Sequence, residues 1–172
     1  MPHIVVSSLS RLAETADAHG ASHMVTLINR GTPVTRPAGI AADNHLFLAF
    51  NDIVEPIAGM TPPGEAHVRD LLDFTADWDR ASPILIHCFA GISRSTAAAY
   101  ITALALNPAL DELGLARHLR TASPSATPNA RLVAIADAVL GRDGRMVEAI
   151  AGIGRGADAF EGEPFVVPLE LG

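Results

Sequence analysis

The chain has 172 residues, which is enough for one well-buried domain and short for two. Hydrophobic residues make up 49% of it and charged residues 18%, a composition that excludes a disordered chain. The formal net charge is −7, and the chain contains no lysine, so a nucleic-acid-binding surface is not expected. We expect a single domain over residues 1–172, with residues 160–172 as a C-terminal extension.

The cysteine content and the N-terminus point to a cytoplasmic protein. Cys88 is the only cysteine, so no intramolecular disulfide can form, and a reactive thiol needs a reducing compartment. Residues 1–8 lack the basic region and the long apolar segment of a signal peptide. No run approaches the roughly 20 apolar residues of a membrane span. We therefore expect no membrane span.

Short apolar runs and helical patterns alternate along the first half of the chain. Apolar runs rich in β-branched residues and bounded by turn residues predict strands. Apolar residues three to four positions apart predict helices. The predicted strands are residues 4–6, 23–28, 46–50 and 84–86, and the predicted helices are residues 9–19 and 65–80.

Helical patterns dominate the second half. They cover residues 93–106, 110–120, 130–140 and 146–153, and a short edge strand is expected at 165–167. Strands that alternate with helices, followed by helices alone, predict an α/β fold. We expect a central, mostly parallel sheet of four to five strands flanked by helices, with the functional site at the C-terminal ends of the strands.

A reactive stretch follows the last strand of this alternating half. Ile84-Leu85-Ile86-His87-Cys88-Phe89-Ala90-Gly91-Ile92-Ser93-Arg94-Ser95 is an apolar run, a tight turn and the start of a helix. Backbone N–H groups in such a turn and the helix dipole attract an oxyanion and favour the thiolate form of a cysteine. Arg94 can hold two phosphate oxygens at once, which a lysine cannot do.

The sequence HCFAGISRS resembles the signature loop of the cysteine-based protein tyrosine phosphatases. The agreement covers His87, Cys88, Gly91, Arg94 and Ser95. The resemblance implies a tyrosine-phosphatase-like fold in which Cys88 is the nucleophile and forms a phosphocysteine. It also implies that Arg94 clamps the phosphate and that the Ser95 hydroxyl stabilises the leaving thiolate. Gly91 would let the backbone turn its amides inward.

The rest of the loop would form the phosphate-binding site, which would also take sulfate or vanadate. Its variable positions carry no basic residue, whereas phosphoinositide-specific relatives tend to have basic residues there. A phosphotyrosine protein is therefore the substrate that the resemblance favours. The expected substrate-binding residues are Phe89, Ala90, Gly91, Ile92, Ser93 and Arg94.

Phosphate ester cleavage also needs a general acid from elsewhere in the chain. Asp52 directly follows the third predicted strand, as the acid loop does in this family. The loop lacks Trp-Pro-Asp and looks more like that of the dual-specificity branch. Glu55 and Asp43 are alternatives, and Asp52 could also be an ordinary turn residue.

Two further polar residues are candidates for supporting roles. The resemblance implies that His87 lies in the core and shapes the thiolate environment, as a buried histidine at a strand end commonly does. Asn129 could brace the signature loop or could cap the following helix. The histidines show no metal-ligand spacing, so neither a metal nor another cofactor is expected.

Other functions remain open from the sequence. The same mechanism could act on a non-protein phosphate ester such as a lipid, nucleotide or sugar. A rhodanese-like sulfurtransferase also holds a cysteine in a loop of amides, although it lacks the Arg-Ser pair at this spacing. A phosphate-binding pseudophosphatase would keep Arg94 and normally lose Cys88 or the acid.

Overall fold

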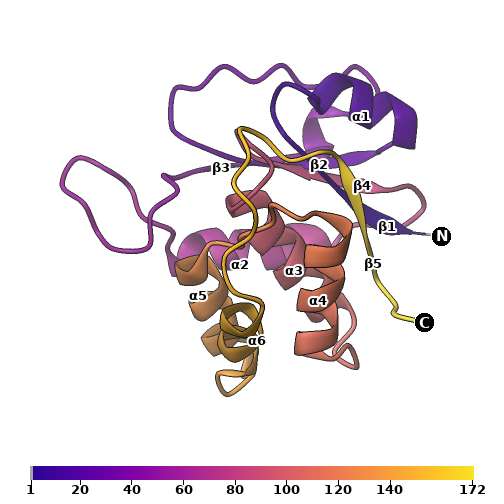
Figure 1. Cartoon of the computed structure of the whole chain (residues 1–172). Helices are drawn as coiled ribbons and strands as arrows, with labels where there is room; N and C mark the ends of the chain where they lie inside the picture. Colours follow the sequence, from indigo (N-terminus) through magenta and orange to yellow (C-terminus); the bar gives the residue numbers. More distant parts are fainter. Residues whose placement is uncertain (1) are drawn as a thin grey trace.

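The computed structural model describes residues 2–172 and contains one five-stranded sheet (Figure 1). The strands lie in the order β3-β2-β4-β1-β5. Four of them are parallel, and β5 pairs antiparallel with β1, so the predicted α/β class with a mostly parallel sheet is confirmed. The strands are β1 His3–Ser7, β2 His23–Ile28, β3 His45–Ala49, β4 Ile84–His87 and β5 Phe165–Pro168.

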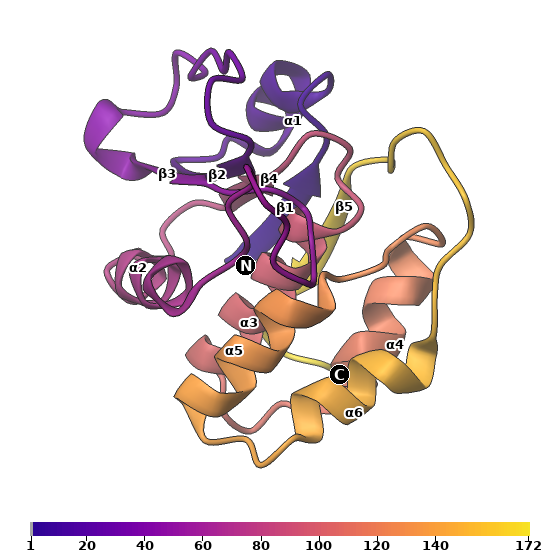
Figure 2. The ribbon, with the colours of Figure 1, turned by 90° about the vertical axis from the view of Figure 1, so that its left-hand side faces the viewer.

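Helices cover both faces of the sheet unequally. The α1 helix packs on one face, and the helices from α2 to α6 lie on the other (Figures 1 and 2). The α3 helix contacts β1, β2, β4 and β5 and is buried from Arg94 through Leu104, because its many alanines allow close packing. The helices are α1 Leu12–His19, α2 Glu65–Ala76, α3 Arg94–Leu106, α4 Glu112–Ala122, α5 Ala130–Leu140 and α6 Arg145–Ile153, with a 3₁₀ turn at Ala42–Asn44.

The hydrophobic core follows this division. Alternate residues of the strands point to opposite faces, so Val5 and Leu85 pack with Leu12 of α1. Their neighbours Ile4 and Ile84 belong to the larger cluster on the other face. The central strands are therefore buried on both sides, which explains why they read as continuous apolar runs.

Two predicted helices are shorter in the structure than their patterns suggest. The first begins at Leu12 and not at residue 9, because the preceding residues form a turn in which the Leu12 N–H donates to the Leu9 carbonyl and the Leu9 N–H to the Phe89 carbonyl. The second ends at Ala76 and not at residue 80. Arg80 adopts a φ of 60°, which no helix allows, and the Trp78 indole donates to the Ser82 carbonyl. The first difference therefore involves a long-range contact, and the second a local turn.

A buried ion pair connects the helices α3, α4 and α6. The Glu112 carboxylate accepts from Arg142 Nη1 and from Arg145 Nε, each at 3.0 Å. Arg142 also donates to the Leu104 carbonyl at 2.7 Å, and the Tyr100 hydroxyl donates to the Glu112 carbonyl at 2.9 Å. These bonds connect α3 to α4 and to the turn before α6.

We predict that the two arginines contribute very differently to stability. The Arg142 side chain is 10% exposed and that of Arg145 is 52% exposed, although both bond the same carboxylate oxygen. Arg142→Met should lower the free energy of unfolding by about 3–5 kcal/mol, because it leaves a buried carboxylate without its main partner. Arg145→Met should lower it by less than about 1 kcal/mol. Urea denaturation measures both, and equal losses would contradict this account.

Candidate active site

The candidate site lies at the end of the sheet where the parallel strands finish. The loop of residues 88–93 connects β4 to α3, and the segments that follow β1, β2 and β3 reach the same edge. This is the position expected for a site in an open α/β sheet. The loop is called the signature loop below.

Cys88 is buried at the start of the signature loop, with 3% of its surface exposed. The Gly91 N–H donates to its Sγ at 3.2 Å, and Ser95 Oγ lies 3.1 Å from the same sulfur. Both groups can donate a hydrogen bond to a thiolate. The structure therefore places Ser95 and Gly91, predicted from the sequence, in direct contact with the sulfur.

Gly91 is required by the shape of the loop. Its φ is +71°, a conformation that favours glycine. A Cβ atom at this position would lie 2.9 Å from the carbonyl carbon of Ser7 and from the nitrogen of Ser8. The loop therefore packs directly on the backbone that leaves β1, which leaves no room for a side chain.

Arg94 is buried at the first position of α3, with 6% of its surface exposed. Its Nη1 donates to Asn29 Oδ1 at 2.7 Å and to the Phe50 carbonyl at 2.8 Å. Its Nε is buried and has no acceptor among residues 2–172. One nitrogen is thus fixed by the ends of β2 and β3, while another buried donor lacks a partner from the protein.

Asp52 lies in the loop after β3, next to the signature loop. Its Oδ1 accepts from Ser93 Oγ and from Asn129 Nδ2, both at 2.8 Å. Both bonds fall on the same carboxylate oxygen. The geometry brings Asp52 to the loop that holds Cys88.

Asn129 does both of the things that the sequence left open. Its Oδ1 accepts from the Leu132 N–H at 2.9 Å, which caps α5. Its Nδ2 holds Asp52, and its backbone N–H donates to the Ser93 carbonyl at 3.1 Å. A single residue therefore connects α5, the Asp52 loop and the signature loop.

The two alternative acids lie differently. Glu55 lines a cavity of about 470 Å³ together with Asp52, Ser93 and Asn129. Asp43 lies in the 3₁₀ turn that precedes β3, whereas Asp52 follows that strand. Asp43 therefore lies at the opposite end of β3 from Asp52, and the structure does not bring it to the site.

His87 is buried directly before Cys88. Its Nδ1 lies 3.3 Å from the Cys88 carbonyl oxygen, and its Nε2 lies 2.7 Å from Thr26 Oγ1. Since a carbonyl can only accept, Nδ1 carries the proton and Nε2 accepts from the Thr26 hydroxyl. Burial lowers the pKa of His87 to about 4. The imidazole is thus neutral at pH 7, which fits a residue that orients the backbone beside the thiol.

Two contacts around the site were not predicted from the sequence. Asn29, which holds Arg94, could have been suspected because it follows β2 at the same sheet edge. The segment after α6 reaches the signature loop, where the Gly162 N–H donates to the Ala90 carbonyl at 2.8 Å. Nothing in its composition predicts this contact between residues far apart in the chain.

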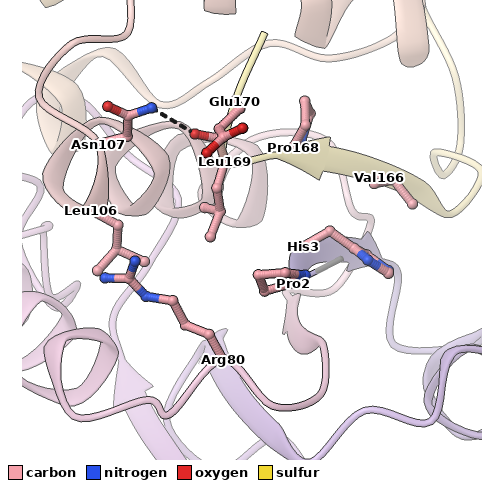
Figure 3. A pocket seen from close by; sticks show the side chains of 9 residues that line it. All are labelled: Pro2, His3, Arg80, Leu106, Asn107, Val166, Pro168, Leu169 and Glu170. Atoms are coloured by element: carbon pink, nitrogen blue, oxygen red, sulfur yellow. Dashed lines mark hydrogen bonds between the residues drawn. The ribbon is translucent and has the colours of Figure 1, made fainter. Parts of the chain in front are cut away.

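Another cavity lies at the opposite end of the strands (Figure 3). It has a volume of about 550 Å³ and is lined by His3 at the start of β1, Leu106 at the end of α3 and residues that follow β5. Its charged side chains are Arg80 and Glu170. Cys88 and the other candidate residues do not line it, so this cavity is separate from the candidate site.

The part of the chain that the structure describes shows neither a metal cluster nor a membrane helix. No three His, Cys, Asp or Glu side chains among residues 2–172 gather in a group that could hold a metal ion. None of the helices within the same residues combines the length and the hydropathy needed to cross a bilayer.

Comparisons with known proteins identify the fold. No protein-family model matches the chain, and no curated protein matches it in sequence. DUSP15 matches with a TM-score of 0.66 at 16% identity, over 88% of this chain and 92% of that one. Human DUSP28 matches with a TM-score of 0.60 at 20% identity, over 81% and 94%.

A third match is the human tyrosine phosphatase-like serine/threonine/tyrosine-interacting protein. Its TM-score is 0.63 at 13% identity, over 83% of this chain and 97% of that one. At these identities the similarity is one of fold. The fold expected from the signature loop is therefore confirmed: the chain has the fold of the dual-specificity branch of the cysteine-based tyrosine phosphatases.

Proposed function

We propose that this chain is a phosphomonoester hydrolase, acting on phosphotyrosine proteins through a phosphocysteine intermediate. The arrangement of Arg94 carries the proposal. A buried guanidinium whose Nε has no protein acceptor is costly unless a ligand supplies one. A phosphate oxygen is a fitting acceptor, because a guanidinium binds phosphate through two parallel hydrogen bonds. The neutral acceptors on Nη1 leave its positive charge for the substrate.

The remaining residues support two chemical steps. Cys88 Sγ attacks phosphorus, the bond to the ester oxygen breaks, and Asp52 gives that oxygen a proton. Water then attacks the phosphocysteine, Asp52 takes a proton from it, and phosphate leaves as the Cys88 thiolate reforms. Ser95, 3.1 Å from the sulfur, stabilises the departing thiolate. His87 orients the backbone of Cys88.

Two observations weigh against the alternative functions. The fold of the dual-specificity phosphatases argues against a sulfurtransferase. The joint presence of Cys88, Ser95 and Asp52 around one loop favours an enzyme over a phosphate-binding pseudophosphatase. A lipid, nucleotide or sugar phosphate would use the same chemistry. A thiol nucleophile needs a reducing compartment, which favours a cytoplasmic location.

Phosphate release from an aryl phosphate tests the proposal. Activity should persist in EDTA, because the steps above use no metal, and vanadate should inhibit by binding in the signature loop. Cys88→Ser should reduce turnover to background while the chain keeps its fold, since a serine hydroxyl is a poor nucleophile in a site suited to a thiolate. Turnover near that of the original chain would remove Cys88 from the mechanism.

We also predict that Arg94→Lys is nearly as damaging as Arg94→Ala. A lysine keeps the charge but offers no planar pair of donors, so it cannot bind two phosphate oxygens in the same geometry. The values of kcat/KM for an aryl phosphate should fall to similar levels in both variants. If lysine restored most of kcat/KM, charge alone would explain the role of Arg94.

The loss of kcat caused by Asp52→Asn should depend on the leaving group of the substrate. We expect a loss of about 10²- to 10⁴-fold in kcat for phenyl phosphate, whose leaving oxygen needs a proton. Nitrophenyl phosphate, whose leaving group is stable as an anion, should lose much less. The measurement is kcat across esters of graded leaving-group pKa, with Asp43→Asn as the matched control at the opposite end of β3. An unchanged dependence in Asp52→Asn would transfer the role to Glu55.

A further inference from the structure

The segment of residues 154–164 forms a wall beside the signature loop. After α6 the chain runs back along the helices to the end of the sheet and then returns as β5 (Figures 1 and 2). The Gly156 N–H donates to Thr127 Oγ1 at 3.0 Å, the Ala157 N–H to the Pro124 carbonyl at 2.9 Å and the Gly162 N–H to the Ala90 carbonyl at 2.8 Å.

Two glycines show how closely this segment is packed. A Cβ on Gly162 would lie 3.0 Å from the Gly91 carbonyl oxygen, and one on Gly156 would lie 2.7 Å from the Ser125 backbone. The path of the segment is therefore fixed by the loop and by the turn before α5. The backbone between these glycines is therefore held close to the signature loop.

A cavity of about 160 Å³ lies between this segment and the signature loop. It is lined by Leu9, Ser10, Phe89, Phe160 and Glu161. Phe89 directly follows the nucleophile and is 56% exposed, and Phe160 is 90% exposed. Two exposed aromatic rings, one of them from the residue after Cys88, therefore line the same cavity as one carboxylate.

Glu161 is held in its ionised form. Its Oε2 accepts from Ser10 Oγ at 2.5 Å. Hydrogen bonds from Ser10 and Ser8, helped by the charge of Arg11, keep the pKa of Glu161 below its usual value. Arg11 itself is engaged with Glu14 and with Glu163. A negative charge therefore persists at the rim of the cavity at neutral pH.

The neighbouring cavity adds to this charge pattern. It has a volume of about 290 Å³, and its charged lining residues are Asp52, Arg155 and Asp158. Arg155 Nη2 lies 2.6 Å from Asp158 Oδ1, so its charge is compensated within the wall. The two cavities are thus lined by three carboxylates, Asp52, Asp158 and Glu161, and by one guanidinium, that of Arg155.

From these observations we propose that the Phe89–Phe160–Glu161 cavity binds a cationic side chain, arginine or lysine, close in sequence to the phosphorylated residue of a peptide substrate. A cation is attracted to the faces of aromatic rings and to a carboxylate, and the methylene stem of the same side chain packs on apolar surface. The inference rests on the proposed phosphatase function and adds a preference that the signature loop alone does not carry. A substrate with a second phosphate would meet the Glu161 carboxylate.

The test compares phosphotyrosine peptides that differ at one position. Arginine is placed in turn at each of the two positions on either side of the phosphotyrosine, and each peptide has a partner with norleucine there. In the original chain at least one arginine peptide should exceed its norleucine partner by about three- to tenfold in kcat/KM, the range expected for an exposed cation on aromatic rings and a carboxylate. Phe160→Ala and Glu161→Gln should each reduce that ratio to about twofold or less. Glu170→Gln, which lines the cavity at the opposite end of the strands, should leave it unchanged.

Two further arms separate the possible failures. Nitrophenyl phosphate carries no neighbouring side chain, so its turnover reports the phosphatase function by itself. The affinity of Cys88→Ser for the same peptides, measured by fluorescence anisotropy, reports the cavity whether or not turnover occurs. Equal values for arginine and norleucine peptides in both assays would overturn the inference. A preference for peptides with glutamate at that position, or for a doubly phosphorylated peptide, would overturn it as well. If the chain bound arginine peptides selectively but did not hydrolyse nitrophenyl phosphate, only the proposed hydrolase function would be refuted.

Discussion

The burial of the Arg94 guanidinium is the constraint on which the site depends. A buried charge requires hydrogen-bond partners, and Nη1 finds two in the Asn29 side chain and the Phe50 carbonyl. Those partners follow β2 and β3, so the ends of two strands are tied to the first residue of α3. Because both partners are neutral, the positive charge is not cancelled by them. The same bonds that stabilise the fold thus prepare the site for an anion.

A second junction couples the Asp52 loop to the rest of the site. Asn129 holds Asp52 by its side chain and the signature loop by its backbone, while it caps α5. The loop around Asp52 exposes the apolar side chains of Val54, Ile57 and Met60. Its position therefore depends strongly on the polar contacts at its start. A change at Asn129 would affect both loops together.

The C-terminal segment contributes to the sheet and to the site. Its strand β5 pairs with β1 and covers the edge that β1 would otherwise expose. The preceding residues pack on the signature loop through Gly162. The wall beside the loop is therefore formed by residues about 70 positions away from Cys88.

The sequence by itself determined the fold class, the bounds of most elements and the position of the signature loop between a strand and a helix. These follow from local patterns. Apolar runs predict the strands, helical spacing predicts the helices, and the spacing of Cys88, Gly91 and Arg94 after an apolar run predicts the loop. Only the tertiary structure decided which residues hold the signature loop and its flanking residues in place. Asn29, Thr26 and Gly162 come from distant segments, and no local pattern encodes a contact that depends on how strands and loops meet. The late start of the first predicted helix coincides with a contact of this kind, the bond from the Leu9 N–H to the distant Phe89 carbonyl. The early end of the second is a local feature, set by the Arg80 backbone and by the bond from the Trp78 indole to the Ser82 carbonyl.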